Sequence, residues 1–371
     1  MTAVDFEPGD AAGEQVPGVD CLFDKVKLGP NRLSNRLVMA PMTRNRAEPD
    51  GTPGALAAEY YSQRAGLGLI ITESTQPSEN GQGYMTTPGI YTDAHVAGWR
   101  RVTDAVHDRG GRIVIQLAHA GRMSHPDNTP HGRPGLAPSP VGPGTGIFTP
   151  SGMQPIPTPL EMSDDQVRAV VEEFRHAARR AIKAGADGVE IHGGTGYLIH
   201  QFLGASSNYR TDDWGGAIER RARFAVEVAR SVSAEIGAER TGIRLSPGAN
   251  IFGIDEGVEA EALYQHLVVE LDHLNLGYLH ITQFGEDAVV RALRRLWGGA
   301  FILNRPGRPR EAIGSDVESG LADFEAYGQL VLANPDFERR LREGAPFNDA
   351  DRATFYGGGA AGYVDYPRLP D

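Results

Sequence analysis

The sequence is poor in cysteine and in lysine. Its 371 residues include one cysteine, Cys21, which excludes an intramolecular disulfide and a cysteine-based metal cluster or redox pair. The only lysines are Lys25, Lys27 and Lys183, and 36 basic residues against 48 acidic ones give a net charge of -12. Because an acidic chain is repelled by phosphodiester backbones and by anionic lipid, we expect no nucleic-acid partner and no membrane partner.

Long apolar runs are also missing. No stretch of about 18 apolar residues is present, so the sequence predicts no membrane span. The first twenty residues contain acidic side chains but no Lys or Arg, which is the opposite of the basic start of a secretory signal. We therefore expect a cytoplasmic protein with a flexible acidic tail at 1–20 and one domain at 21–371.

What the sequence does contain is a regular alternation of short apolar runs with longer helical patterns. The strand-like runs lie at 36–40, 69–72, 112–117, 188–191, 242–245, 278–282, 300–304 and 323–327. The helical patterns between and after them lie at 55–65, 93–109, 163–184, 219–236, 259–274, 287–296, 310–319 and 335–342, and Ser163 to Gln166 form a capping box. Eight such units predict an α/β protein, a (β/α)8 TIM barrel, with a doubly wound open sheet as the alternative.

One segment departs from the alternation. Residues 118–159 are rich in proline and glycine and show no periodicity. They follow the third strand, on the face of a barrel where active sites lie. We expect this long loop to cap a pocket rather than to link two domains.

Polar residues gather where the predicted strands end. In a barrel these ends meet at one mouth, as a small-molecule site requires. The sequence thus predicts a hydrophobic small-molecule substrate as partner, and it leaves an oligomer possible. No metal site is predicted, because His119, His125, His131 and Asp127 match no metal-binding spacing.

Several segments resemble the old yellow enzyme family of flavin-dependent ene-reductases. The matching strings occur in the family's order and fall at the expected strand ends: NRLVMAPMT (35–43), EYYSQR (59–64), GYLIHQFL (196–203), NYRT (208–211), GIRLSP (242–247) and FYGGGAAGYVDYP (355–367). The resemblance runs from about residue 21 to the end of the chain. It implies a TIM barrel with FMN across its mouth.

The resemblance also implies roles for individual residues. Tyr197 resembles the tyrosine that protonates the substrate carbon, and His192 resembles the first of two residues that bind the substrate carbonyl; these are the candidate catalytic residues, and a core packing role is the alternative for each. The candidate substrate-binding residues are Thr43, Tyr84, Ala118, His119, Thr195, Phe252 and Tyr356. If flavin is retained, the candidate cofactor-binding residues are Pro41, Met42, Thr43, Ser74, Gln116, Arg244, Asn304, Arg305 and Gln329. For Arg244 a structural ion pair is an equal alternative to a ligand contact.

Four positions depart from the family pattern. Thr195 stands where the family has His or Asn, Ser74 where it has a small residue, Pro306 in a glycine-rich turn, and Gln329 where it has the phosphate-binding arginine. A lost charge-assisted hydrogen bond costs about 1.5–3 kcal/mol. Arg305, Arg308 or Arg310 are possible substitutes for that arginine.

These departures lead to the expectation of a degenerate flavin site. On that interpretation the barrel needs no cofactor and catalyses a redox-neutral cyclisation or isomerisation of a large unsaturated carbonyl compound in bacterial natural-product biosynthesis. The first alternative is an FMN-dependent NAD(P)H ene-reductase. The second is a non-catalytic protein that binds a ligand.

Overall fold

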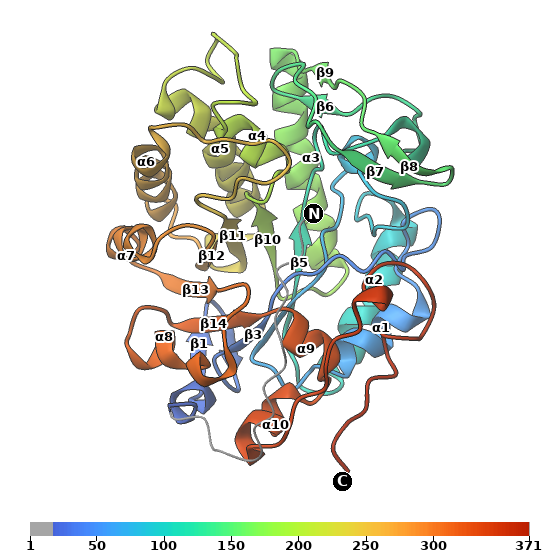
Figure 1. Ribbon diagram of the computed structural model, residues 1–371, viewed down its shortest axis with the longest axis vertical. Coiled ribbons are helices and arrows are strands. Elements are labelled where there is room, and N and C mark those ends of the chain that lie inside the picture. The colour runs from blue at the N-terminus through green and yellow to red at the C-terminus, as the bar shows by residue number, and fades with distance from the viewer. Residues whose placement is uncertain (1–17, 371) are drawn as a thin grey trace.

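Eight parallel strands form a closed barrel in the computed structural model, which describes residues 18–370. The tail predicted at 1–20 lies outside the described residues up to residue 17. Figure 1 shows the strands at the centre of the molecule. They are β3 (Leu37–Met39), β4 (Leu69–Ile71), β5 (Ile113–Leu117), β10 (Gly188–His192), β11 (Thr241–Leu245), β12 (Tyr278–Thr282), β13 (Ala300–Asn304) and β14 (Phe324–Tyr327). The predicted TIM barrel is confirmed, and the open-sheet alternative is wrong.

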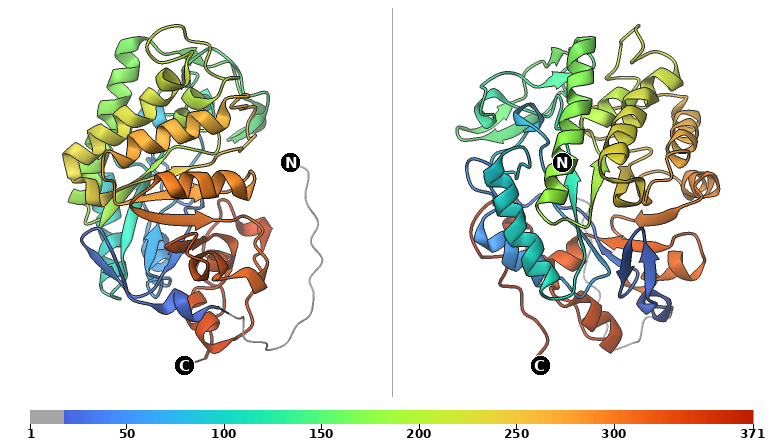
Figure 2. Two further views of the ribbon diagram at one scale, coloured as in Figure 1. Left: turned by 90° about the vertical axis from the view of Figure 1, so that its left-hand side faces the viewer. Right: turned by 180° about the vertical axis from the view of Figure 1, so that it is seen from behind.

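Helices surround the barrel (Figure 2). The predicted ones are α1 (Ala55–Ser62), α2 (Asp93–His107), α3 (Asp164–Lys183), α5 (Ile218–Ile236), α6 (Ala260–Asp272), α7 (Asp287–Leu296) and α10 (Phe337–Glu343), and two short ones, α4 (Leu198–Leu203) and α9 (Gln329–Ala333), lie in addition near strand ends. The capping box before α3 is confirmed, since Ser163 Oγ accepts from the Gln166 N–H and Gln166 Oε1 accepts from the Ser163 N–H.

The helix predicted at 310–319 is instead broken. A 3-10 turn (Arg310–Ala312) and the single-turn helix α8 (Ser315–Glu318) are separated by Gly314, whose φ is +91°. A residue with positive φ cannot continue a right-handed helix, so the chain changes direction there. Within the described residues, no helix is both long and apolar enough to cross a membrane.

The barrel interior is apolar at one end and polar at the other. A hairpin of β1 (Val26–Leu28) and β2 (Asn31–Leu33) packs Leu28 and Leu33 against inward-facing side chains such as Leu69 and Phe324. Nearer the carboxyl ends of the strands, the inward positions are taken by Gln116, Glu190, Arg244, His280 and Asn304. Polar groups inside a barrel must find partners, so this layer is where ligand chemistry is to be sought.

The long loop after β5 covers the mouth. It contains a 3-10 turn (Pro126–Asn128), a hairpin of β7 (Gly146–Thr149) and β8 (Gly152–Pro155), and β6 (Leu136–Ala137), which pairs with β9 (Leu160–Glu161). Its buried residues Ala120, Met123, Ile147 and Ile156 pack against Tyr84, Tyr197 and Phe252. This packing places the loop over three of the predicted site residues.

Two arginines after β3 clamp the end of the chain to the mouth. Arg44 donates to the carbonyls of Phe355 and Gly362, and Arg46 donates to those of Thr354, Gly359 and Ala361. Both guanidinium groups also lie over the ring of Tyr363. The segment 354–363 therefore forms part of the mouth's wall.

Candidate active site

A small cavity of about 20 Å³ opens at the mouth beneath the capping loop. It is lined by five of the predicted residues, Thr43, Ser74, Tyr84, Ala118 and Tyr197, together with Gln76, Gly81, Gly83, Thr87 and Ala120. Four of these ten lining residues are glycine or alanine, so little side-chain bulk surrounds the cavity.

His192 and Thr195 form one hydrogen-bonded pair at the end of β10. His192 Nδ1 faces the Gly194 N–H at 3.4 Å, which places the ring proton on Nε2, 3.0 Å from Thr195 Oγ1. Burial, with the charge of Arg244 nearby, lowers the pKa of His192 well below its usual value. A neutral imidazole therefore donates to the threonine hydroxyl, whose own proton is free to point elsewhere.

Tyr197 lies against this pair. Its ring meets that of His192 edge-on, with 4.9 Å between ring centroids. Burial raises the pKa of Tyr197 well above its usual value, and the neighbouring Tyr84 adds to this effect. The phenol therefore keeps its proton at neutral pH.

Gln116 and Arg244 occupy the inner layer below. Ser74 Oγ donates to Gln116 Oε1 at 3.0 Å. Arg244 donates to Thr282 Oγ1 at 2.7 Å and to Asn304 Oδ1 at 3.4 Å, and within residues 18–370 it has no carboxylate within 4 Å. Arg244 therefore forms no structural ion pair within the described residues. Its guanidinium group can bind an anionic group of a ligand.

The three arginines after β13 are all engaged with the protein. Arg305 pairs with Asp287 and Asp316, and Arg308 pairs with Asp316 and with Glu325. Arg310 donates to the Ala345 carbonyl and lies over the ring of Phe347. None of the three is left as an unpaired substitute for the missing phosphate-binding arginine.

The remaining predicted residues are scattered around the mouth. Pro41 and Met42 are half-buried after β3, and Gln329 is exposed at the start of α9. Phe252 has a φ of +54°, and Tyr356 is 69 % exposed but close enough to Tyr197 to affect its pKa. His119 is buried outside the cavity lining, with Nδ1 accepting from the Gly121 N–H.

Sequence reasoning missed Glu190 and His280. Both are fully buried in the barrel, and His280 Nδ1 donates to Glu190 Oε2 at 2.9 Å. The alternation along β10 could have revealed Glu190, because it lies two residues before His192 on the same inward face.

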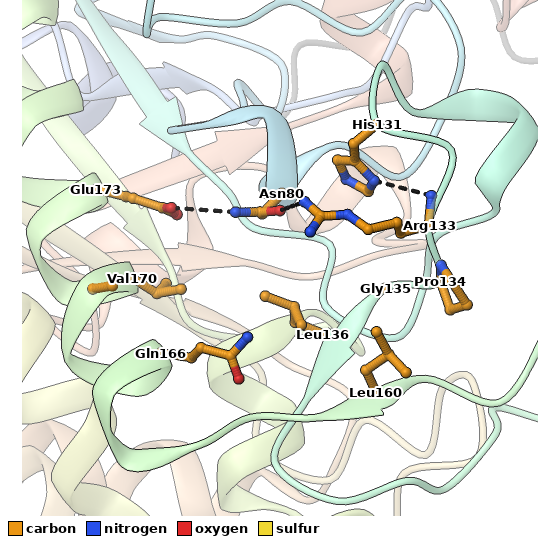
Figure 3. Close-up of a pocket in the computed structure, with 11 residues that line it drawn as sticks. Asn80, His131, Arg133, Pro134, Gly135, Leu136, Leu160, Gln166, Val170 and Glu173 are labelled. Atoms are coloured by element: carbon orange, nitrogen blue, oxygen red, sulfur yellow. Dashed lines mark hydrogen bonds between the residues drawn. The ribbon is translucent and has the colours of Figure 1, made fainter.

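A second cleft, of about 120 Å³, lies between the capping loop and α3 (Figure 3). Asn80 bridges its two sides, accepting from Arg133 and donating to Glu173, while Leu136 and Val170 line its floor. None of the predicted site residues lines this cleft. Within residues 18–370, no three His, Cys, Asp or Glu side chains are grouped as a metal site would need.

Comparison with known proteins decides the family. Residues 21–348 match the model of the NADH:flavin oxidoreductase / NADH oxidase family. A solved old yellow enzyme homologue from Zymomonas mobilis superposes with a TM-score of 0.90 at 37% identity, covering 94% of this chain and 99% of its own. The chain belongs to the old yellow enzyme family.

Other members of the family are as similar. A protein of Leishmania infantum named a probable flavin mononucleotide-dependent alkene reductase is 41% identical, covering 94% of this chain and 98% of its own. The putative 12-oxophytodienoate reductase 3 of Oryza sativa subsp. japonica is 42% identical over 98% of this chain and 95% of its own. Morphinone reductase in complex with tetrahydroNAD gives a TM-score of 0.90 at 41% identity, covering 94% and 98%.

These relatives correct two expectations. The main interpretation, a cofactor-free cyclase or isomerase of natural-product biosynthesis, is wrong, because near full-length relatives are named as a flavin mononucleotide-dependent alkene reductase and as 12-oxophytodienoate reductases. The expectation that no cofactor is bound is wrong for the same reason. The substitutions at the phosphate end concern one end of the cofactor only, so they do not exclude a bound cofactor. The family assignment supports an oxidoreductase.

The residues present at the mouth fit FMN at its ring end. Thr43, the Gln116 amide and the Arg244 cation offer hydrogen-bond donors and a positive charge to a polar ring edge. Near the carboxyl ends of β13 and β14, the N–H groups in the first turn of the five-residue helix α9 have no acceptor within the helix. Gly307, with φ +74°, has open space around its α-carbon and leaves the main chain accessible there.

Proposed function

We propose that the protein is an FMN-dependent ene-reductase that uses a reduced nicotinamide to reduce a carbon–carbon double bond conjugated to a carbonyl. The observation that carries the proposal is the meeting, at one mouth, of the His192–Thr195 pair, the protonated Tyr197 and Arg244, which forms no ion pair within residues 18–370. The names of the relatives support the same chemistry.

The hydrogen-bonded pair serves to bind the substrate oxygen. Bound FMN supplies the hydride chemistry of this family. His192 stays neutral and directs its Nε2 proton at Thr195, so the hydroxyl proton of Thr195 is polarised toward the substrate. A donor at the carbonyl oxygen stabilises the enolate that forms when the alkene is reduced.

Tyr197 serves as the proton donor to carbon. With its pKa raised by burial, it releases its proton only to a strong base such as the substrate carbanion. Tyr84 lines the same cavity as Tyr197 and gives the proton a way to be replaced.

The lining indicates a hydrophobic cyclic enone as substrate class. Gly81, Gly83, Ala118 and Ala120 place little side-chain bulk around the cavity that Tyr84 and Tyr197 also line. An apolar body with one carbonyl at its end suits this lining.

Anaerobic half-reactions test the proposal. FMN-loaded protein is expected to be bleached by NADPH or NADH and to regain its colour on addition of 2-cyclohexenone. Tyr197→Phe should be bleached as fast as the wild type but be reoxidised about 100- to 10,000-fold more slowly, the usual range for loss of a general acid. Failure of the protein to bind FMN, or of the enone to reoxidise it, would refute the proposal.

A further inference from the structure

A buried carboxylate lies inside the barrel directly beneath the mouth. Glu190 has no exposed surface. In the register of the sheet it stands opposite Gln116 on β5, while His192, two residues on, stands opposite Arg244 on β11. Glu190 is therefore one layer below the residues that face the substrate. A carboxylate buried so completely must be hydrogen-bonded or balanced by charge.

Its two oxygens are held by different partners. Glu190 Oε1 accepts from Gln116 Nε2 at 2.8 Å, and Oε2 accepts from His280 Nδ1 at 2.9 Å. Because an ionised carboxylate only accepts hydrogen bonds, the Gln116 amide must turn its nitrogen toward Glu190. Its oxygen is thereby turned the other way, where Ser74 Oγ donates to it. Glu190 thus fixes the orientation of the Gln116 amide.

The same carboxylate acts on Arg244 at a distance. No described carboxylate lies within 4 Å of Arg244. Burial lowers the pKa of this guanidinium, and the negative charge of Glu190 opposes that effect. His280 stands beside Arg244 in the register, and burial lowers the pKa of His280, so this ring adds no charge. Glu190 is the balancing charge of the inner layer.

We propose that Glu190 is a positioning residue for the flavin site, which fixes the Gln116 amide and offsets the positive charge of Arg244. The inference rests on the proposed function. With Glu190 in place, the positive charge of Arg244 near the flavin ring is partly offset. Arg244 therefore stabilises the electron-rich, reduced flavin less strongly. Removing the negative charge should therefore favour the reduced, anionic flavin.

The midpoint potential of bound FMN tests the charge role. Glu190→Gln keeps the side-chain volume and an acceptor for Gln116 but removes the charge. We expect about tenfold stronger relative binding of reduced over oxidised FMN, equivalent to a rise of about 30 mV for a two-electron couple. Glu173→Gln is the matched control, because Glu173 accepts hydrogen bonds from Ser78 and Asn80 outside the barrel and should leave the potential unchanged.

Binding of FMN to apoprotein, followed by flavin fluorescence, tests the orienting role. Glu190→Ala should weaken binding about tenfold, the cost of a lost charge-assisted hydrogen bond. In a Gln116→Met background the same substitution should change affinity by less than about twofold, because no amide remains to be oriented.

The outcomes separate this inference from the proposed function. If Glu190→Gln has the potential of Glu173→Gln, or if Glu190→Ala weakens FMN equally with and without Gln116, the positioning role is wrong while the reductase assignment stands. If Glu190→Ala does not fold, the potential of Glu190→Gln decides alone. If wild-type protein does not bind FMN, both fail together.

Discussion

Replacing Thr195 by asparagine is expected to relieve strain in the backbone. Thr195 has a φ of +43°, in the left-handed region that β-branched residues avoid and asparagine tolerates. A non-glycine residue held there costs about 1–3 kcal/mol. If asparagine recovers about 1 kcal/mol of this, the melting temperature of a chain this long rises by roughly 1–2 °C.

The same substitution adds a donor at the mouth. Thr195 Oγ1 lies 3.0 Å from His192 Nε2 and has one proton to give. An asparagine side chain can accept from His192 through its oxygen and still offer two N–H protons. One additional net hydrogen bond, worth about 0.5–1.5 kcal/mol, predicts a two- to tenfold gain in kcat/KM for an enone.

Stopped-flow reoxidation by 2-cyclohexenone and thermal unfolding followed by circular dichroism provide the two measurements. Thr195→Ala is the control, since it keeps the strained backbone but has no hydroxyl, and it should reoxidise more slowly with no gain in melting temperature. A Thr195→Asn protein that melts lower than the wild type and shows an unchanged kcat/KM would refute both the strain argument and the donor count.

Three further predictions concern other parts of the mouth. Gln329→Arg should tighten FMN binding about ten- to hundredfold, as a charge-assisted contact worth about 1.5–3 kcal/mol would; titration of apoprotein showing no change would contradict this. Tyr84→Phe should slow reoxidation less than Tyr197→Phe does and leave bleaching by NADPH unaffected, which stopped-flow absorbance can show. Burial raises the pKa of Glu73 from 4.5 to about 7. Protonated Glu73 therefore stabilises the fold fully below about pH 4.5, and this stabilisation is lost as the pH rises to 7. Glu73→Gln should therefore gain melting temperature relative to the wild type between pH 5 and pH 8, and a constant difference across that range would count against this.

The strands and the mouth were predictable because their signals are local. A buried strand such as 188–192 is a short apolar run bounded by glycines, and the carboxyl ends of eight such runs meet at one place in any parallel barrel. The residues at those ends could therefore be grouped before their distances were known. The short pairs β6–β9 and β7–β8 were not expected, because strands of two to four residues leave no periodicity to detect.

Partnerships across the barrel were beyond the reach of the sequence. The pairing of Gln116 with Glu190 depends on the register between β5 and β10, and that of Arg308 with Glu325 depends on how the chain turns after β13. Reading Arg305 or Arg308 as free cations ignored acids that only the fold brings near. The wrong prediction about the cofactor came from the same region, because substitutions at the phosphate end were interpreted as loss of the whole flavin site.

The clamp formed by Arg44 and Arg46 has a consequence for biosynthesis. Arg44 comes early in translation, but one of its carbonyl partners, Thr354, lies 310 residues later. The barrel itself cannot close until β14 has reached β3. At about 5–20 residues per second, a ribosome leaves the early strands without these partners for many seconds. The nascent chain therefore has no complete mouth, and no place to retain a cofactor, until the segment 354–363 has emerged.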